Sequence, residues 1–231
     1  MQTMKHKKKT RSDMSGFTAI LFDLDGTLVD TKDLILTSFR KASVDILGQA
    51  IPDEDILPLI GIPLIEQAKI LAPEYAEALI ESYRLYNIEL HDELIQYFEG
   101  TREMLEELQA EGRRLAVVTS KRNEPALEGL KSFDLQRFFE FVSGLEETRK
   151  HKPDPEPLLV AAQRMGLAAT DCIYIGDSVY DIQAADAAGM VSIAALWGMY
   201  SREQLLEAGA QHEAASPSEL PALIRSIEAG Q

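Results

Sequence analysis

The sequence predicts an α/β fold, in which a parallel sheet carries helices on both faces and a helical segment follows the first strand. Two observations predict it. Short apolar runs of strand length recur from Thr18 onward, and helix-length amphipathic segments separate the later ones. The segment 31–97 holds helical patterns and prolines but no convincing strand. Strands that alternate with helices are typical of βαβ units and of a parallel sheet.

Five apolar runs are the expected strands. The first, Thr-Ala-Ile-Leu-Phe-Asp, ends in a carboxylate, and the second, Leu-Ala-Val-Val-Thr, comes almost a hundred residues later. Continuous apolar runs of this length indicate strands that are buried on both faces of a sheet. The five runs are 18–23, 115–119, 141–143, 172–176 and 191–195.

Helices are expected between the later strands, each followed by a glycine that can end it. In the second of them, Asp154 is the expected N-cap and Pro155 the first helical residue. The order of strands and helices predicts a Rossmann-like parallel sheet. The expected helices are 101–111, 155–165 and 181–188.

An all-helical insertion is expected after the first strand. Residues 34–47 and 74–90 have helical patterns, and four prolines punctuate the segment. The chain returns to the sheet through Phe98-Glu99-Gly100. We therefore divide the sequence into a tail at 1–16, an α/β core at 17–30 and 98–231, and a helical insertion at 31–97.

Composition narrows the partners and the location. The chain has 231 residues and a formal net charge of −15, so it repels nucleic acid and anionic membrane surfaces. No apolar stretch approaches the ~20 residues of a membrane span, and no signal peptide is visible. We expect a cytoplasmic protein, either a monomer or a homodimer. The single cysteine, Cys172, lies in an apolar run and is expected to be inert.

The N-terminal residues form a basic run at 5–11. We interpret residues 1–16 as a disordered tail or a remnant of expression rather than as a nucleic-acid-binding arm. The globular part is expected to begin near Phe17.

Chemistry is expected where the parallel strands end, because ligands of such sheets bind beyond the carboxyl ends of the strands. The first strand ends in Asp23-Leu24-Asp25-Gly26-Thr27, the second in Thr119-Ser120, and the fourth in Gly176-Asp177-Ser178, with Asp181 shortly after it. Between the third and fourth strands lies Lys152, in Lys-Pro-Asp-Pro. Carboxylates, hydroxyls and a lysine therefore converge on one edge.

Converging carboxylates repel one another and need a cation. Mg²⁺ suits such a site, because it accepts few carboxylates and shares a substrate phosphate. Together with the ammonium of Lys152 and the hydroxyl donors, it would complement a phosphoryl group. Taken alone, an Asp-x-Asp pair is more often a loop or a helix cap, but here it ends a buried strand. Asp177 could cap the next helix, although Ser178 can do so instead.

Four segments in order resemble the motifs of the haloacid dehalogenase (HAD) superfamily, over about 18–198. They are Phe-Asp-Leu-Asp-Gly-Thr-Leu-Val-Asp at 22–30, Val-Val-Thr-Ser at 117–120, Lys-Pro-Asp-Pro at 152–155, and Gly-Asp-Ser-Val-Tyr-Asp at 176–181. The insertion at 31–97 is similar to the alpha-helical cap of that superfamily. Within it, the segments 59–64, 91–94 and 151–158 resemble phosphoglycolate phosphatases and HAD-type pyrophosphatases.

The resemblance implies a role for each motif residue. Asp23 would be the nucleophile of an aspartyl-phosphate mechanism, and Asp25 the general acid and base. Asp23, the carbonyl of Asp25 and Asp177 would bind Mg²⁺. Thr119, the N–H of Ser120 and Lys152 would hold the phosphate, Asp181 would support the metal site, and Gly26 would allow a sharp turn.

Other functions stay open at this point. The resemblance implies hydrolysis of a small phosphorylated metabolite, with phosphoglycolate as the first candidate and pyrophosphate and small sugar phosphates as the alternatives. A dehalogenase needs neither a second aspartate nor Mg²⁺, so Asp25 and Gly26-Thr27 argue against it. A sugar phosphomutase is compatible with the same motifs. A non-catalytic phospho-acceptor switch shares carboxylates and a lysine but has no helical insertion after its first strand.

The insertion at 31–97 is expected to act as a lid. Two short connections join it to the core, and Gly100 can absorb backbone rotation. The turn Gly61-Ile62-Pro63 is the segment most suited to reach the substrate. The alternative is a rigidly docked subdomain that only stabilises the fold. His91 and His151 have no partner at metal or triad spacing and are expected to be structural or exposed.

Overall fold

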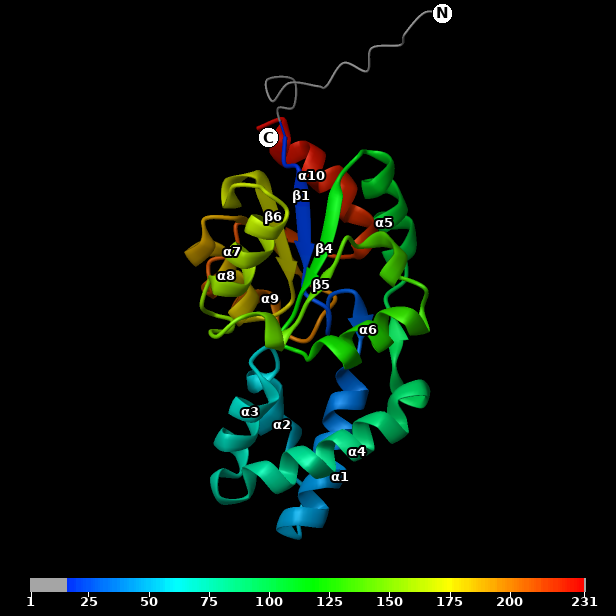
Figure 1. Ribbon diagram of the computed structural model, residues 1–231, viewed down its shortest axis with the longest axis vertical. Coiled ribbons are helices and arrows are strands. Elements are labelled where there is room, and N and C mark those ends of the chain that lie inside the picture. Colours follow the sequence, from blue (N-terminus) through cyan, green and yellow to red (C-terminus); the bar gives the residue numbers. More distant parts are fainter. Residues whose placement is uncertain (1–15, 231) are drawn as a thin grey trace, which may run out of the picture.

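The computed structural model describes residues 16–230 (Figure 1). A six-stranded sheet forms the centre, in the order β5-β4-β1-β6-β7-β8, and every neighbouring pair is parallel. Its strands are β1 (Ala19–Phe22), β4 (Arg114–Val118), β5 (Val142–Ser143), β6 (Cys172–Gly176), β7 (Val191–Ala195) and β8 (His212–Ala214). The Rossmann-like fold expected from the sequence is confirmed.

Helices cover both faces of this sheet (Figure 1). One face packs against α5 (Thr101–Ala110), α6 (Asn123–Ser132) and α10 (Leu220–Glu228), in a buried cluster that includes Leu105, Leu130 and Ile224. The other face packs against α7 (Glu156–Arg164) and α8 (Val179–Ala188), through small residues such as Ala161 and Ala185. Because β1 is buried on both faces, all four of its residues are apolar. The short helix α9 (Arg202–Glu207) follows β7.

Four helices lie between β2 (Val29–Asp30) and β3 (Gln96–Tyr97), and they form a separate cluster beyond the carboxyl ends of the strands (Figure 1). They are α1 (Lys32–Leu47), α2 (Asp53–Ile56), α3 (Leu64–Leu71) and α4 (Ala76–Leu94). Their apolar faces meet in a core of their own, in which the Phe39 and Tyr83 rings lie 4.5 Å apart. This core draws on all four helices, and Met199 of the α/β core packs against it.

Two adjacent chain crossings connect this helical segment to the sheet. Val29 pairs with Tyr97 and Asp30 with Gln96, so β2 and β3 form a small antiparallel ribbon. Gly100 follows with φ +85°, a conformation that L side chains rarely adopt. This ribbon departs from the all-helical segment that the sequence predicts, and at two residues per strand it is too short to give a pattern.

Some elements escaped the sequence analysis. The strand β8 reads His-Glu-Ala, too short and polar to stand out, and it forms an edge of the sheet. The helix α6 was not expected, because Pro125 lies within its first turn, where it interrupts the pattern without breaking the helix. Within the part of the chain that the structure describes, no helix is long and apolar enough to cross a membrane. The basic run at 5–11 lies outside the described residues.

Candidate active site

The strand order brings two aspartates together at the centre of the sheet. Strands β4 and β5 lie on one side of β1, and the later strands β6, β7 and β8 lie on the other, so the strand order switches at β1. Ligands of open α/β sheets bind at such switch points. Asp23 follows β1, and Asp177 follows the neighbouring strand β6. The backbone N–H of Asp23 donates to the carbonyl of Ile175 at 2.9 Å, which extends the sheet pairing into the site. Both aspartates are buried.

Lys152 reaches the same point from the loop before α7. Its Nζ lies 2.8 Å from Asp23 Oδ1 and 2.6 Å from Asp181 Oδ1, and its side chain is 1% exposed. Tyr174 adds its hydroxyl at 3.2 Å from the same Nζ. A buried lysine needs such partners, because an unpaired buried ammonium is costly. One cation is therefore shared by two carboxylates.

The pKa values of Asp23, Asp177 and Lys152 reflect their burial and the small number of cations that face these carboxylates. Burial raises the pKa of Asp23 to about 7, since the attraction of Lys152 only partly offsets it and Asp181 and Asp25 add repulsion. Burial, Asp181 and Asp23 raise the pKa of Asp177 well above its usual range. Burial alone would lower the pKa of Lys152, but Asp181 and Asp23 outweigh it and hold that pKa above its ordinary value.

Asp181 anchors Lys152 and the start of α8. Its Oδ2 accepts from the N–H of Ser178 at 3.0 Å and from the Ser178 hydroxyl at 2.6 Å, while Ser178 caps α8. From the sequence, Asp181 was expected to support the metal site. In the structure its hydrogen bonds run to Lys152, Ser178 and Tyr174.

The side chain of Asp177 packs against two glycines, Gly26 and Gly198. Its Oδ2 accepts from the N–H of Met199 at 2.8 Å, and Oδ1 lies 3.4 Å from the Thr27 hydroxyl. A Cβ at Gly26 would come within 2.1 Å of Asp177, and one at Gly198 within 2.2 Å. Gly26 also has φ +80°, so both its space and its backbone conformation require glycine.

The acidic cluster fits a hard divalent cation. Asp23, Asp177 and Asp181 each offer an oxygen, and these oxygens lie within 4.8 Å of one another. Both carboxylate oxygens of Asp181 already accept hydrogen bonds. Among the described contacts, only Oδ1 of Asp23 accepts a side-chain hydrogen bond. An all-oxygen set with a surplus of negative charge is the chemistry that such a cation binds.

Asp25 lies beside the cluster at the mouth of a cavity. Its Oδ1 accepts from the Thr31 hydroxyl at 2.8 Å and from Lys121 Nζ at 2.8 Å. The cavity has a volume of about 400 Å³. Asp23, Asp25, Thr119, Ser120, Lys152 and Asp177 all line it. The structure thus brings the motif residues of the sequence analysis around one space.

The helical segment closes the other side of that cavity. Ile62, Gln67 and Tyr83 line it from this segment. The Ser120 hydroxyl donates to the carbonyl of Gly61 at 2.6 Å, so the turn predicted to reach the substrate lies against the second motif. Gln67 Nε2 donates to the carbonyl of Ile62 at 2.8 Å and fixes the same turn.

Two tyrosines of the core hold the neighbouring loop. The hydroxyl of Tyr180 lies 2.9 Å from the carbonyl of Pro58, and that of Tyr200 lies 2.7 Å from the same oxygen. Tyr200 also lies 3.0 Å from the carbonyl of Ile60. These contacts attach the helical segment to the core through backbone oxygens, at a place set apart from the ribbon of β2 and β3.

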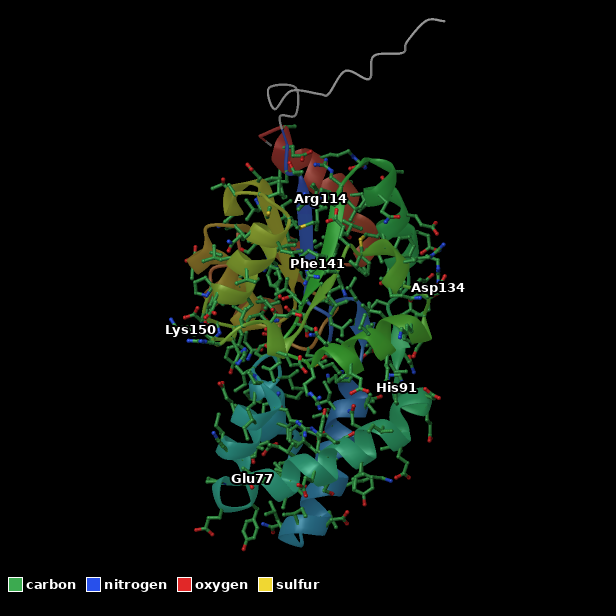
Figure 2. All side chains as sticks on the ribbon, in the orientation of Figure 1. Glu77, His91, Arg114, Asp134, Phe141 and Lys150 are labelled. Carbon is green, nitrogen blue, oxygen red and sulfur yellow. The ribbon has the colours of Figure 1, made fainter. Side chains whose placement is uncertain are left out.

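Sequence reasoning missed four of these residues. Lys121, Thr31, Tyr174 and Tyr200 stand in no motif that was singled out. Lys121, Tyr174 and Tyr200 contact partners distant in sequence, whereas Thr31 contacts the nearby Asp25. Lys121 directly follows Thr119-Ser120, and that position was the one available signal. His91 lies near the end of α4 (Figure 2), its side chain is 19% exposed, and its ring contacts Asp92 at 3.0 Å. Neither His91 nor His151 lines the cavity.

Comparison with known proteins agrees with this geometry. A family profile described as haloacid dehalogenase-like hydrolase matches residues 20–195. This chain belongs to that family, and it is a hydrolytic enzyme of the phosphatase group.

Two curated relatives are similar to this chain over most of its length. A Caldanaerobacter subterraneus protein with the name PpaX is 41% identical over 188 residues, which is 81% of this chain and 86% of the relative. The pyrophosphatase PpaX of Listeria welshimeri is 35% identical, over 91% of this chain and 98% of the relative.

Solved structures share the fold. A hydrolase from Pseudomonas syringae has a TM-score of 0.81 at 28% identity, covering 91% of this chain and 99% of the other. A predicted phosphoglycolate phosphatase from Haemophilus somnus has a TM-score of 0.84 at 22% identity, with the same coverage. The second likeness is one of fold alone.

Proposed function

We propose that this protein is a Mg²⁺-dependent phosphohydrolase that acts on a small phosphorylated metabolite through an aspartyl-phosphate intermediate. One observation carries the proposal. Asp23 is a buried carboxylate that lines the cavity, and its Oδ1 is held at 2.8 Å by a buried lysine. An aspartate that is fixed, desolvated and open to a pocket has the properties of a nucleophile.

In the first step, an oxygen of Asp23 attacks phosphorus and the bond from phosphorus to the leaving oxygen breaks. The electron pair of that bond goes to the leaving oxygen, which takes a proton from the carboxyl group of Asp25. Thr119 and the N–H of Ser120 hold phosphate oxygens, and Lys152 compensates the charge on the transferring group.

In the second step, Asp25 takes a proton from a water molecule, which attacks the phosphorus of the aspartyl phosphate. The bond from phosphorus to Asp23 breaks, inorganic phosphate leaves, and both aspartates return to their starting states. Splitting hydrolysis into two displacements lowers each barrier.

Mg²⁺ would be held by the carboxylates of Asp23 and Asp177 and by the carbonyl of Asp25. When bound, it would supply positive charge beside the phosphate oxygens. Asp181 would keep Lys152 in place rather than bind the ion directly, because its donors already occupy its oxygens.

The substrate is a small metabolite that fits a cavity of about 400 Å³. The curated relatives at 35% to 41% identity favour inorganic pyrophosphate, since the names of both describe a pyrophosphatase, PpaX. Phosphoglycolate is the second candidate, from the family resemblance of the sequence. A sugar phosphomutase would need the cavity to retain a sugar during both steps. A cytoplasmic location and a monomeric or homodimeric state remain predictions from the sequence.

We also propose that the helical segment 31–97 is a lid over the site. The hydrogen bonds from Ser120, Tyr180 and Tyr200 to its loop are few and lie at one edge, so they can break and reform. A lid would exclude water while the aspartyl phosphate exists.

A panel of phosphate compounds tests the function. Purified protein with Mg²⁺ should release inorganic phosphate steadily from pyrophosphate or phosphoglycolate, and the Asp23→Asn variant should not. A protein that takes up a single equivalent of phosphate without turnover would be a phospho-acceptor switch. No release from any member of the panel would overturn the proposal.

A further inference from the structure

Lys121 lines the cavity and has no role in the chemistry described above. Its Nζ lies 2.8 Å from Asp25 Oδ1, and its side chain is 18% exposed. The backbone around it is fixed, since its N–H donates to Thr119 Oγ1 at 3.2 Å and its carbonyl accepts from the N–H of Leu145 at 2.9 Å. The ammonium is therefore presented to the cavity from a rigid position.

The position of Asp25 fixes where the leaving group must lie. A general acid has to come within about 3 Å of the oxygen that it protonates. Because Lys121 Nζ touches the carboxyl group of Asp25, it lies within a few ångströms of that leaving oxygen and of any group attached next to it. Lys152 lies on the side of the nucleophile, where it contacts Asp23 and Asp181.

Apart from Asp23, Asp25, Lys152 and Asp177, the other charged side chains that line the cavity lie farther into solvent. Arg84, Arg122, Glu124 and Glu128 are exposed, and Arg122 is paired with Glu146 at 3.1 Å. Exposed charges are screened by water and salt, whereas a mostly buried ammonium is screened much less. Lys121 is therefore the least screened cation beside the leaving group, since Lys152 is held by Asp23 and Asp181.

We propose that Lys121 is a specificity-determining residue that recognises negative charge on the leaving group. It selects phosphoanhydrides, or phosphoesters with an anionic group close to the bridging oxygen, over phosphoesters with a neutral or cationic leaving group. This inference rests on the proposed phosphohydrolase function and deepens it. It also gives one physical reason for grouping pyrophosphate and phosphoglycolate as substrates, since both release an anion.

Three substrates with the same two-carbon skeleton provide the test. Phosphoglycolate has a carboxylate on its leaving group, 2-hydroxyethyl phosphate a hydroxyl, and phosphoethanolamine an ammonium. For the wild-type protein we expect kcat/KM to fall in that order, by about tenfold or more from the first to the last, because only the first places an anion beside Lys121. A wild-type protein that prefers phosphoethanolamine would overturn the inference without any variant.

Substitution then assigns the preference to this side chain. Lys121→Gln should bring the three kcat/KM values to within about threefold of one another, chiefly by lowering that of phosphoglycolate, whereas Lys121→Arg should keep the order. The matched control is Lys131→Gln, which removes an exposed lysine that lies outside the cavity and should leave the order unchanged.

The outcomes separate this inference from the function on which it rests. If Lys121→Gln slows all three substrates by the same factor, Lys121 only positions Asp25 and the inference is wrong, while the phosphohydrolase stands. If the wild-type protein hydrolyses none of the panel, the proposed function itself fails. Circular dichroism would show whether Lys121→Gln folds. If it does not fold, the order of kcat/KM over the three substrates, measured for the wild type and for Lys121→Arg, still tests the inference.

Discussion

Lys152 and Asp23 form a buried ion pair, with 2.8 Å between Nζ and Oδ1, in which the lysine is also bound to Asp181. Asp177 lies in the same cluster with no lysine or arginine partner among the described ion pairs. One ammonium thus faces three buried carboxylates. Burial and this imbalance together raise the pKa of Asp23, and the imbalance supports the affinity for a cation that we propose.

Replacing the nucleophile should abolish turnover and leave the fold intact. Asp23→Asn keeps the shape of the side chain and can still accept from Lys152, but an amide does not form an acyl phosphate. Phosphate release should fall below detection while circular dichroism is unchanged. Asp186→Asn, at an exposed aspartate of α8, is the matched control and should retain full activity. Near-normal activity of Asp23→Asn would exclude Asp23 as the nucleophile.

Replacing the general acid should slow the reaction by less. Asp25→Asn removes proton transfer to the leaving oxygen, a contribution on the order of 10²–10⁴-fold. The loss should be smallest for substrates whose leaving group needs no proton, such as p-nitrophenyl phosphate. Steady-state kinetics on both kinds of substrate measure this difference. A variant that works at full speed on every substrate would assign the proton transfer to another residue.

Removing divalent metal should stop hydrolysis, since three carboxylates without a cation repel an anionic substrate. Exhaustive chelation followed by dialysis should abolish phosphate release, and added Mg²⁺ should restore it. Added Mg²⁺ should also raise the melting temperature, because a ligand that binds only the folded state stabilises it. Sustained activity after chelation would contradict the assignment of a metal centre.

The stability of the metal-free protein should fall as the pH rises from 5 to 8. The pKa of Asp23 is raised from 3.8 to about 7 in the folded state, so between these values the folded state binds a proton that the unfolded state has lost. The resulting stability is present at low pH and disappears as the pH passes through about 7.

Melting curves in the presence of chelator measure this effect. Asp23→Asn should show a flatter dependence on pH than the wild type, and Mg²⁺ should stabilise the wild type more at pH 8 than at pH 5, because the ionised carboxylate binds it. Parallel pH profiles for the two proteins would show that Asp23 ionises normally.

The turn around Ile62 should set substrate preference. Ile62 is 8% exposed and lines the cavity, and its carbonyl is fixed by Gln67. A bulky or charged residue at this position should change kcat/KM by different factors for different phosphoesters, and leave the Mg²⁺ concentration for half-maximal activity unchanged. Kinetics over the panel test this. A uniform effect on all substrates would count against the lid.

The sequence was sufficient for five of the six strands of the sheet and for the residues that directly follow them. Asp23, Thr119 and Asp177 could be placed together because parallel strands end at the same edge, and that rule needs no side-chain detail. The side chains that contact these residues could not be predicted in this way. Tyr174 was part of an apolar strand pattern, and nothing local shows that its hydroxyl reaches Lys152.

Lys121 shows the same limit most clearly. A lysine in a loop is usually solvated, and the contact that distinguishes it joins residues 96 positions apart in the chain. Contacts of this kind depend on the packed fold, so the pattern of one segment cannot reveal them. The edge strand β8 was missed for a simpler reason, since three half-polar residues give too little periodicity.

The aspartyl phosphate is the central claim, and trapping it is the most direct test. Protein turning over pyrophosphate that is labelled with radioactive phosphorus can be quenched in acid, digested and mapped by mass spectrometry. We expect label on the peptide that contains Asp23, more of it in Asp25→Asn because the second step is slowed, and none in Asp23→Asn. Rapid phosphate release with no labelled peptide, or label on a residue other than Asp23, would contradict the account.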